Sequence, residues 1–129
     1  MKIRTDRKEL LDHYKDSSNL NLRTSLHQNY STSPVPWGSW LFDHINLPAE
    51  ACVLEVGCGP GGIWKSTEKV ERLNWSPYLT DLSTGMVAEA RMALADNDRF
   101  RFLTADSQDL PFPDDHFDGV LSCAMMYHV

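Results

Sequence analysis

The sequence predicts an α/β fold built on a parallel sheet. Segments with the composition of strands alternate with segments whose apolar residues recur at helical spacing, and this alternation is typical of βαβ units. One short apolar strand, from Val53 to Val56, runs directly into a turn with glycines at 57, 59 and 62, where a helix should begin. Glycine suits such a turn because it adopts positive φ angles and lets the backbone approach a ligand closely.

Length and charge narrow the function classes. The chain has 129 residues and a formal net charge of −6, which fits one acidic globular domain and argues against a generic nucleic-acid binder. It has no apolar signal core and no run approaching 18 apolar residues, so we expect a cytoplasmic protein without a membrane partner. The spacing of Cys52, Cys58 and Cys123 predicts small buried thiols and no metal site.

Three helices are expected before the glycine turn. The first covers about residues 7–15, the second runs from Ser17 or Ser18 to about residue 30, and the third begins at Trp37 and ends before Pro48. In the third helix, apolar residues at helical spacing predict a stripe that faces the core. These residues are Trp37, Trp40, Leu41 and Ile45. Stacking of the two tryptophans on an aromatic substrate is the alternative interpretation.

Further strands and helices are expected after the turn. A helix over residues 63–73 is followed by a short strand over 75–80, which Pro77 weakens near its start. Ser83 is a plausible N-cap for a helix that runs to Leu94. A strand over 99–104, a loop over 110–115 and a last apolar strand over 117–125 complete the pattern.

Acidic residues stand at the ends of three successive strands. They are Glu55, Asp81 and Asp106. The carboxyl ends of parallel strands converge on one crevice, where ligands bind in doubly wound sheets. Asp81 follows the glycine turn by about twenty residues, the place from which a carboxylate accepts ribose hydroxyl protons. Asp106 would lie beside a base edge. Dinucleotide and adenosyl ligands both fit this arrangement.

Three motifs resemble the class I S-adenosylmethionine-dependent methyltransferases, in particular the small-molecule enzymes called methyltransferase type 11 or 25. They are Val-Leu-Glu-Val-Gly-Cys-Gly-Pro-Gly (53 to 61), Leu-Thr-Asp-Leu-Ser-Thr-Gly-Met (79 to 86) and Ala-Asp-Ser-Gln-Asp-Leu-Pro-Phe-Pro-Asp-Asp-His-Phe-Asp-Gly-Val (105 to 120). The Leu-Pro-Phe loop in the third motif is not a feature of nicotinamide-binding folds. The motifs and their connecting elements cover the chain from about Cys52 to Val129.

The resemblance implies a Rossmann-like, doubly wound, mostly parallel sheet in which the four strands present follow the order 3-2-1-4. Residues 1–48 would form a helical cap, and residues 49–129 would form the cofactor-binding half-domain. The implied cofactor is S-adenosyl-L-methionine. The implied cofactor-binding residues are Glu55, Gly57, Cys58, Gly59, Asp81, Leu82, Asp106, Ser107 and Gln108. Tyr127 or His128 would lie nearest the transferred methyl group, with His128 nominated as a general base if the acceptor must lose a proton.

Members of the resembled family continue through three further strands. The half-domain is therefore expected to be truncated, and its fourth strand to present an open edge through which the chain forms a homo-oligomer. We expect a methyltransferase that acts on a small molecule, or the cofactor-binding fragment of one. A nicotinamide-dependent oxidoreductase domain and a non-catalytic interaction module are the alternative hypotheses.

Overall fold

A parallel sheet forms the centre of the molecule. The structure is a computed structural model that describes residues 7–13, 15–17, 32, 34–35, 37–65 and 74–123. Its four strands follow the order β3-β2-β1-β4, and every pairing is parallel. They are β1 (Cys52–Val56), β2 (Ser76–Asp81), β3 (Arg101–Thr104) and β4 (Gly119–Ser122). The predicted fold class and strand order are confirmed.

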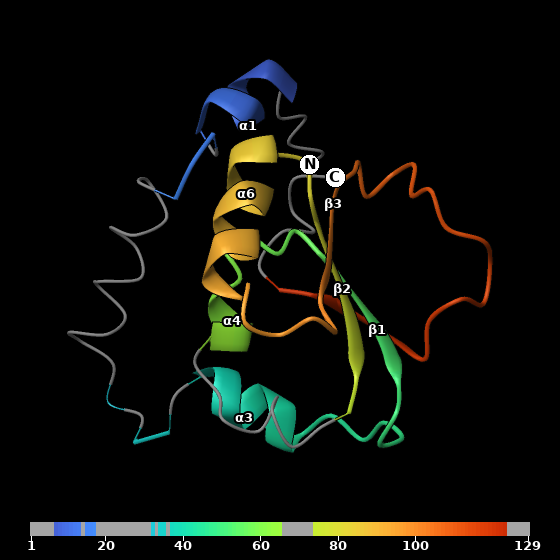
Figure 1. Ribbon diagram of the computed structural model, residues 1–129. Coiled ribbons are helices and arrows are strands. Elements are labelled where there is room, and N and C mark those ends of the chain that lie inside the picture. Colours follow the sequence, from blue (N-terminus) through green and yellow to red (C-terminus); the bar gives the residue numbers. More distant parts are fainter. Residues whose placement is uncertain are drawn as a thin grey trace, which may run out of the picture.

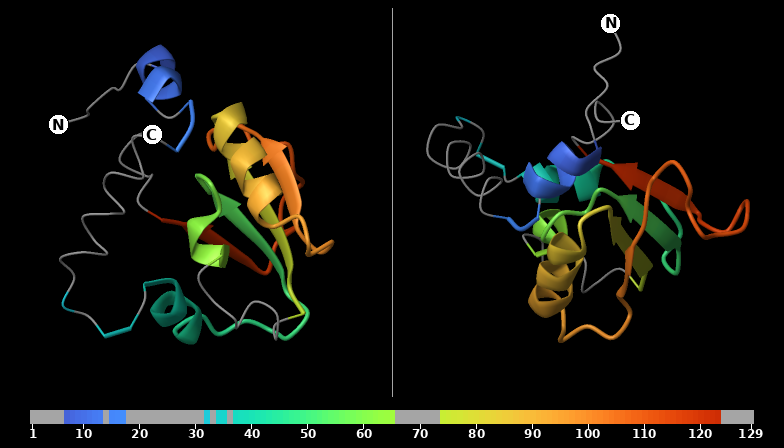
Figure 2. Two further views of the ribbon diagram at one scale, coloured as in Figure 1. Left: turned by 60° about the vertical axis from the view of Figure 1, so that its left-hand side comes forward. Right: turned by 90° about the horizontal axis from the view of Figure 1, so that it is seen from above.

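Helices lie along one face of the sheet (Figures 1 and 2). These are α3 (Trp37–Asp43), α4 (Gly62–Lys65) and α6 (Thr84–Ala93). A further helix, α1 (Arg7–His13), lies at the end of the molecule where α6 begins. Since α6 follows directly after the carboxyl end of β2, α1 stands beside the edge of the sheet at which ligands bind in such folds.

Aromatic side chains fill the space between these helices and the sheet. The ring of Trp64 in α4 lies 5.0 Å from that of Phe42 in α3 and 5.6 Å from that of Phe100, measured between ring centroids. The ring of Trp75, the residue just before β2, lies 6.0 Å from that of Phe42. All four side chains are buried. Because each aromatic ring removes a large apolar area from water, this cluster attaches α3 and α4 to the sheet.

The second strand accommodates its proline without losing a sheet hydrogen bond. Pro77 lies inside β2, opposite Val53 of β1. The amide of Ser76 donates to the carbonyl of Ala51 at 2.9 Å, so the backbone of the next residue faces away from β1. On that side the pairing with β3 begins only at Tyr78. Pro77 lacks an N–H, but no strand of the described residues lies opposite its nitrogen, so the sheet loses no hydrogen bond there. The strand β2 therefore spans all six residues.

The predicted helix after β2 is confirmed together with its cap. The side chain of Ser83 accepts a hydrogen bond from the backbone amide of Met86 at 3.2 Å. This bond satisfies one of the amides that the first turn of α6 leaves without a partner. Met86, Val87 and Ala90 are buried against the sheet, as their helical spacing predicts.

The expectation that Trp37 and Trp40 face the core is wrong. They are 56% and 44% exposed, whereas Gly38 and Phe42 occupy the buried face of α3. The two indoles stack on each other at 5.3 Å, and Trp40 stacks on His44 at 4.2 Å. The tryptophans therefore cover part of their apolar surface by stacking on each other and on His44, while the smaller Phe42 fits the space beside Trp64 and Trp75.

Several predicted segments lie outside the described residues. These are the second N-terminal helix, residues 66–73 of the helix expected after the glycine turn, and residues 124–125 of the strand expected over 117–125, which the structure shows only as β4, Gly119–Ser122. Within the part of the chain that the structure describes, α1 is shorter than the predicted helix by two residues, ending at His13 instead of residue 15.

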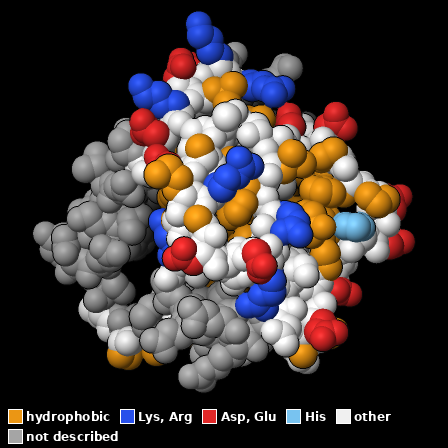
Figure 3. All heavy atoms as spheres, viewed as in Figure 1, with side chains coloured by type: hydrophobic (Ala, Val, Ile, Leu, Met, Phe, Trp, Pro, Cys, Tyr) orange, Lys and Arg blue, Asp and Glu red, His pale blue; other side chains and the backbone are white. Residues whose placement is uncertain are grey.

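The second face of the sheet is covered differently. The loop over 105–118 runs along it (Figure 1), and its rings contact Tyr78 of β2. Phe112, His116 and Phe117 lie 5.8, 6.0 and 5.3 Å from Tyr78 between ring centroids. Figure 3 shows hydrophobic side chains gathered beside a histidine on this side of the molecule. Among the described residues, every helix is too short or too polar to cross a membrane.

Candidate functional site

The glycine turn connects β1 to α4 and is held against β2. The amide of Cys58 donates to the carbonyl of Thr80 at 2.9 Å. Gly57 and Gly59 have φ angles of 70° and 54°, a conformation that side chains with a Cβ rarely adopt. At these two positions the backbone of the turn carries no side chain, so a ligand can approach it closely at the carboxyl end of β1, as the motif predicts.

The third functional glycine is Gly61 and not Gly62, which corrects the predicted register. Gly61 has a φ of 81°, and a Cβ added there would lie 3.2 Å from Leu94 Cδ1 and 3.4 Å from Ala90 Cβ. Gly62 is the first residue of α4, and nothing lies within 4 Å of the position a Cβ would take. The close packing between the turn and α6 therefore depends on Gly61.

Asp81 joins the glycine turn to the start of α6. Its Oδ2 accepts a hydrogen bond from the Gly59 amide at 3.0 Å, and its Oδ1 accepts one from the Ser83 amide at 2.8 Å. Burial raises the pKa of Asp81, and hydrogen bonds from the amides of Ser83, Gly59 and Leu82 partly oppose that rise. Each carboxylate oxygen has a second lone pair, so Asp81 retains acceptor capacity for the hydroxyls of a ligand.

Glu55 is a buried carboxyl at the same edge. It is 2% exposed, and its Oε1 accepts a hydrogen bond from the indole Nε1 of Trp64 at 3.1 Å. Burial raises the pKa of Glu55 to about 8; the Trp64 hydrogen bond lowers it and the charge of Asp81 raises it. The folded protein therefore favours the protonated form of this carboxyl, and a cation beside it would favour the charged form.

The thiol of Cys58 is buried, as predicted. Its side chain is 7% exposed, and its thiol donates to the carbonyl of Gly59 at 3.2 Å. Burial, with the nearby Glu55 and Asp81, raises the pKa of this thiol far above its usual range. A thiol that stays protonated is a poor nucleophile. Cys52 and Cys123 are only half-buried, so the expectation of buried thiols is confirmed for Cys58 and wrong for these two.

Asp106 begins a tight turn after β3. Its Oδ1 accepts the Gln108 amide at 2.9 Å, and its carbonyl accepts the Asp109 amide at 3.0 Å. Its Oδ2 lies 3.6 Å from Nη1 of Arg7 in α1, with the two side chains 32% and 68% exposed. The Ala105 amide donates to the Asp81 carbonyl at 2.9 Å. The turn of Asp106, Ser107 and Gln108 therefore lies next to the end of β2.

The structure thus brings most of the predicted site residues to one edge of the sheet. Tyr127 and His128 lie outside the described residues, so their nominated roles stay predictions. No group of three side chains suited to a metal ion occurs in the described ranges.

Two contacts of the site escaped the sequence-based reasoning. Trp64 donates to Glu55, and Arg7 pairs with Asp106. Trp64 comes only two residues after the last glycine, in the first turn of α4. This closeness to the glycine turn is the one feature of the sequence that could have indicated a contact with Glu55. Nothing in the sequence connects Arg7 with a residue 99 positions later.

Comparison with known proteins identifies the family. A model of the methyltransferase domain matches residues 53–129. This chain belongs to that methyltransferase family. The match begins in β1 and includes the glycine turn, Asp81 and Asp106, the residues that converge at the carboxyl edge. It favours the methyltransferase hypothesis over the oxidoreductase one.

Individual methyltransferases resemble parts of the chain. The ubiquinone/menaquinone biosynthesis C-methyltransferase UbiE of Hahella chejuensis is 30% identical over 87 residues, which are 65% of this chain and 35% of that protein. Phosphoethanolamine N-methyltransferase 2 of Haemonchus contortus, solved in complex with S-adenosyl-L-methionine, aligns with a TM-score of 0.66 and 22% identity over 92% of this chain and 28% of its own. The [4+2]-cyclase SpnF aligns with a TM-score of 0.70 and 18% identity over 91% and 48%.

The last two likenesses show the fold alone. The chain spans about a third of the length of the Hahella relative. That a cyclase shares this fold agrees with the general rule that function resides in the site and not in the architecture.

Proposed function

We propose that this methyltransferase domain binds S-adenosyl-L-methionine at the carboxyl edge of the sheet, and that it is the cofactor-binding part of an enzyme that methylates a small molecule. The observation that carries the proposal is the convergence of the glycine turn, Glu55 and Asp81 at that edge. The names of the Hahella and Haemonchus relatives support both the cofactor and a small acceptor.

The residues present fit this cofactor. Glu55 is a buried carboxyl that accepts only one hydrogen bond from the described residues, and a buried carboxylate of this kind is stabilised by a cation. The ammonium group of the cofactor's methionine part supplies one. Asp81 has acceptor capacity for the ribose hydroxyls, and the bare backbone at Gly57 and Gly59 permits close approach. Leu82 and the turn of Asp106, Ser107 and Gln108 would border the adenosine end.

When bound, the cofactor supplies a methyl group on a sulfonium, an already activated leaving group. The protein's own contribution is then to hold and align that group and to exclude water. Tyr127 and His128 remain our candidates for the pocket beside the methyl group, with His128 as a general base where the acceptor carries a proton. We also propose that residues 1–48 form a cap and residues 49–129 the cofactor-binding half. The contact of α1 with Asp106 supports the cap assignment. Phe42 of α3 packs in the core, so this part of residues 1–48 also belongs to the body of the domain.

Titration calorimetry with S-adenosylhomocysteine tests the proposal. We expect saturable binding to the wild-type chain and an affinity about tenfold or more lower for Asp81→Asn, because charge-assisted hydrogen bonds to ribose contribute about 1.5–3 kcal/mol each. Asp96→Asn is the charge-matched control, because Asp96 is exposed in the turn that follows α6, at the end of the helix far from Asp81. It should bind like the wild type.

Two outcomes would contradict the proposal. One is the absence of binding to the wild-type chain. The other is equal loss of affinity in Asp81→Asn and Asp96→Asn, which would point to net charge and not to the site. Titration with NADH provides a test of ligand class, since the oxidoreductase alternative alone expects fluorescence enhancement on binding.

A further inference from the structure

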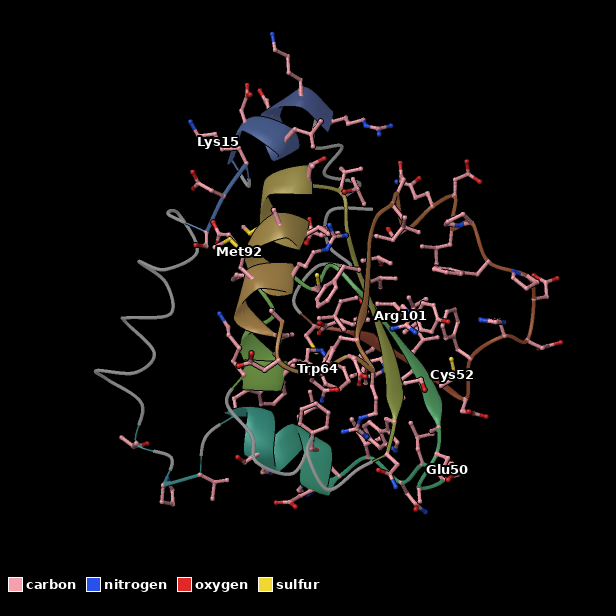
Figure 4. The ribbon with its side chains drawn as sticks, in the orientation of Figure 1. Lys15, Glu50, Cys52, Trp64, Met92 and Arg101 are labelled. Atoms are coloured by element: carbon pink, nitrogen blue, oxygen red, sulfur yellow. The ribbon has the colours of Figure 1, made fainter. Side chains whose placement is uncertain are left out.

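Trp64 is placed to act on the candidate site through Glu55. It lies on α4 against the sheet (Figure 4), and its indole Nε1 donates to Glu55 Oε1 at 3.1 Å. Both side chains are 2% exposed. A hydrogen bond between a neutral donor and a carboxylate is strong when water is excluded from both partners. This bond is therefore the principal favourable interaction that the described protein offers to ionised Glu55.

The indole is held in place by rings from two other elements. Phe42 of α3 lies 5.0 Å from Trp64 at an interplanar angle of 59°, and Phe100 lies 5.6 Å away in an edge-to-face arrangement at 88°. Both neighbours are buried. Because protein interiors are close-packed, the Trp64 ring has little freedom to turn, and its N–H direction is set before any ligand binds.

The other groups around Glu55 oppose its ionisation. Burial raises its pKa most, and the charge of Asp81 at the end of β2 raises it further; burial first and the charge of Glu55 second also raise the pKa values of Cys58 and Cys123. None of the described groups that act on Glu55 is a cation. The indole N–H thus stands alone among them in favouring the charged form.

We propose that Trp64 is a positioning residue of the cofactor site, whose indole N–H orients the Glu55 carboxyl and favours the charged form that pairs with the ammonium group of S-adenosylmethionine. This inference rests on the proposed function. Trp64 lies outside the three sequence motifs, and its role would extend beyond packing in the core.

The first test needs no cofactor. The ionisation of Glu55 is followed by the ¹³C chemical shift of its carboxyl carbon across pH in the wild-type chain and in Trp64→Phe, which keeps a ring and removes the donor. Loss of a hydrogen bond to a charged group should move the midpoint upward by roughly one pH unit or more.

Trp75→Phe is the matched control. Trp75 is also 2% exposed, belongs to the same aromatic cluster and donates its Nε1 to the carbonyl of Pro48 at 2.9 Å, not to an acid. Both substitutions remove one buried indole hydrogen bond, but only Trp64→Phe should shift the Glu55 midpoint. Should Trp64→Phe not fold, benzothienylalanine at position 64 keeps the indole shape without the N–H and takes its place.

The second test measures the affinity for S-adenosylhomocysteine between pH 6 and pH 9. Trp64→Phe should bind about tenfold more weakly near pH 7 and recover part of the difference at pH 9, where a larger share of Glu55 is ionised in the variant. In the Glu55→Gln background, Trp64→Phe should leave the pH dependence unchanged. Trp75→Phe should follow the wild-type profile.

An unchanged Glu55 midpoint in Trp64→Phe overturns the inference, and so does an equal shift in Trp75→Phe. A shift confined to Trp64→Phe, with no binding of S-adenosylhomocysteine to any chain including the wild type, overturns the proposed function and supports the Trp64–Glu55 coupling itself.

Discussion

Glu55 illustrates how one buried side chain links stability to binding. Its carboxyl is enclosed between β1 and α4, and burial raises its pKa from 4.5 to about 8. In the unfolded chain the same carboxyl ionises near its ordinary pKa. Between these values the folded state holds a proton that the unfolded state has released, so the free energy of unfolding falls as the pH rises.

Glu55→Gln should remove this pH dependence. Between pH 4.5 and about 8 the wild-type chain loses up to about 1.4 kcal/mol of stability per pH unit through Glu55, and the amide loses none. We therefore expect Glu55→Gln to gain stability relative to the wild type as the pH rises from 5 to 8.5. Urea denaturation across this range measures the difference. A constant difference between the two proteins would mean that Glu55 titrates normally.

The same substitution should act in the opposite direction on binding. A neutral amide cannot pair with an ammonium group, so we expect Glu55→Gln to bind S-adenosylhomocysteine at least about tenfold more weakly near pH 8. Calorimetry on the proteins used for denaturation provides the measurement. Undiminished affinity would assign Glu55 a purely structural role.

Residues at strand ends were the ones that sequence reasoning could identify. Glu55, Asp81 and Asp106 follow apolar strand patterns, and parallel strands bring their carboxyl ends together whatever the helices do. The partners of these acids come from helices, where a shift of one residue turns a side chain by about 100°. That is why Trp64 and Arg7 were not found, while the three acids were.

At the scale of elements, the glycine turn owes its shape to three left-handed residues. Gly57, Gly59 and Gly61 have φ angles of 70°, 54° and 81°. The sequence contains another glycine at position 62, and pattern matching alone could not tell which of the two packs against α6. The neighbouring pair therefore offers a direct comparison.

Gly61→Ala and Gly62→Ala should change stability in opposite directions. At position 61 a Cβ meets Leu94 and Ala90 in a left-handed conformation, so we expect a loss of about 1–3 kcal/mol. At position 62 the backbone is helical and the space is open, so we expect a gain of about 0.4–1 kcal/mol. Urea denaturation of both variants checks the sign, and a loss at position 62 would refute this description of the turn.

The contact between the N-terminal segment and α6 also depends on a glycine. A Cβ at Gly85 would collide with the backbone carbonyl of Lys15, and the Ser17 amide donates to Glu89 Oε1 one turn further along at 3.1 Å. Figure 4 shows Lys15 between α1 and α6. Together with the Arg7–Asp106 pair, these contacts hold α1 beside the site.

Gly85→Ala should release this segment without harming α6, because alanine is the better helix former. We expect trypsin to cleave after Lys15 roughly severalfold faster in the variant than in the wild-type chain. Met92→Ala is the control on the same helix, since Met92 is 81% exposed and projects from the side of α6 in Figure 4. Equal cleavage rates in all three proteins would show that Gly85 does not hold the segment.

Helix faces were predicted less well than helix positions. The stripe predicted from Trp37 to Ile45 fits one helical face, yet α3 ends at Asp43 instead of just before Pro48, and Trp37 and Trp40 are exposed. Helical spacing cannot distinguish a side chain that packs on the sheet from one that stacks on its neighbour. In α3 it is Phe42, outside the predicted stripe, that fills the space beside Trp64. In α6, by contrast, Met86, Val87 and Ala90 are buried as predicted, and Ser83 caps the helix as predicted.

At the scale of the whole molecule, the sheet presents β4 as an edge strand. β4 pairs with β1 on one side, and no strand among the described residues pairs with its other side. Val120 of β4 is 59% exposed. An apolar edge of this kind favours association with a second strand, so pairing of two chains through β4 stays our prediction.

Light scattering coupled to size-exclusion chromatography tests this association. We expect the mass of a dimer at high protein concentration and a shift toward the monomer in Val120→Lys, because a charged residue on an edge strand opposes pairing. Met92→Lys, which adds the same single positive charge at an exposed position of α6, should keep the wild-type mass. A monomer at all concentrations would contradict edge pairing.

The central claim is that the carboxyl edge of this sheet binds the cofactor. The most direct measurement is a ¹H–¹⁵N spectrum of the wild-type chain recorded during titration with S-adenosylhomocysteine. We predict saturable shifts at the amides of Gly57, Gly59, Leu82, Ser83 and Gln108, and unchanged signals in α3 at the opposite end of the strands. An unaltered spectrum, or shifts centred on α3, would contradict the account.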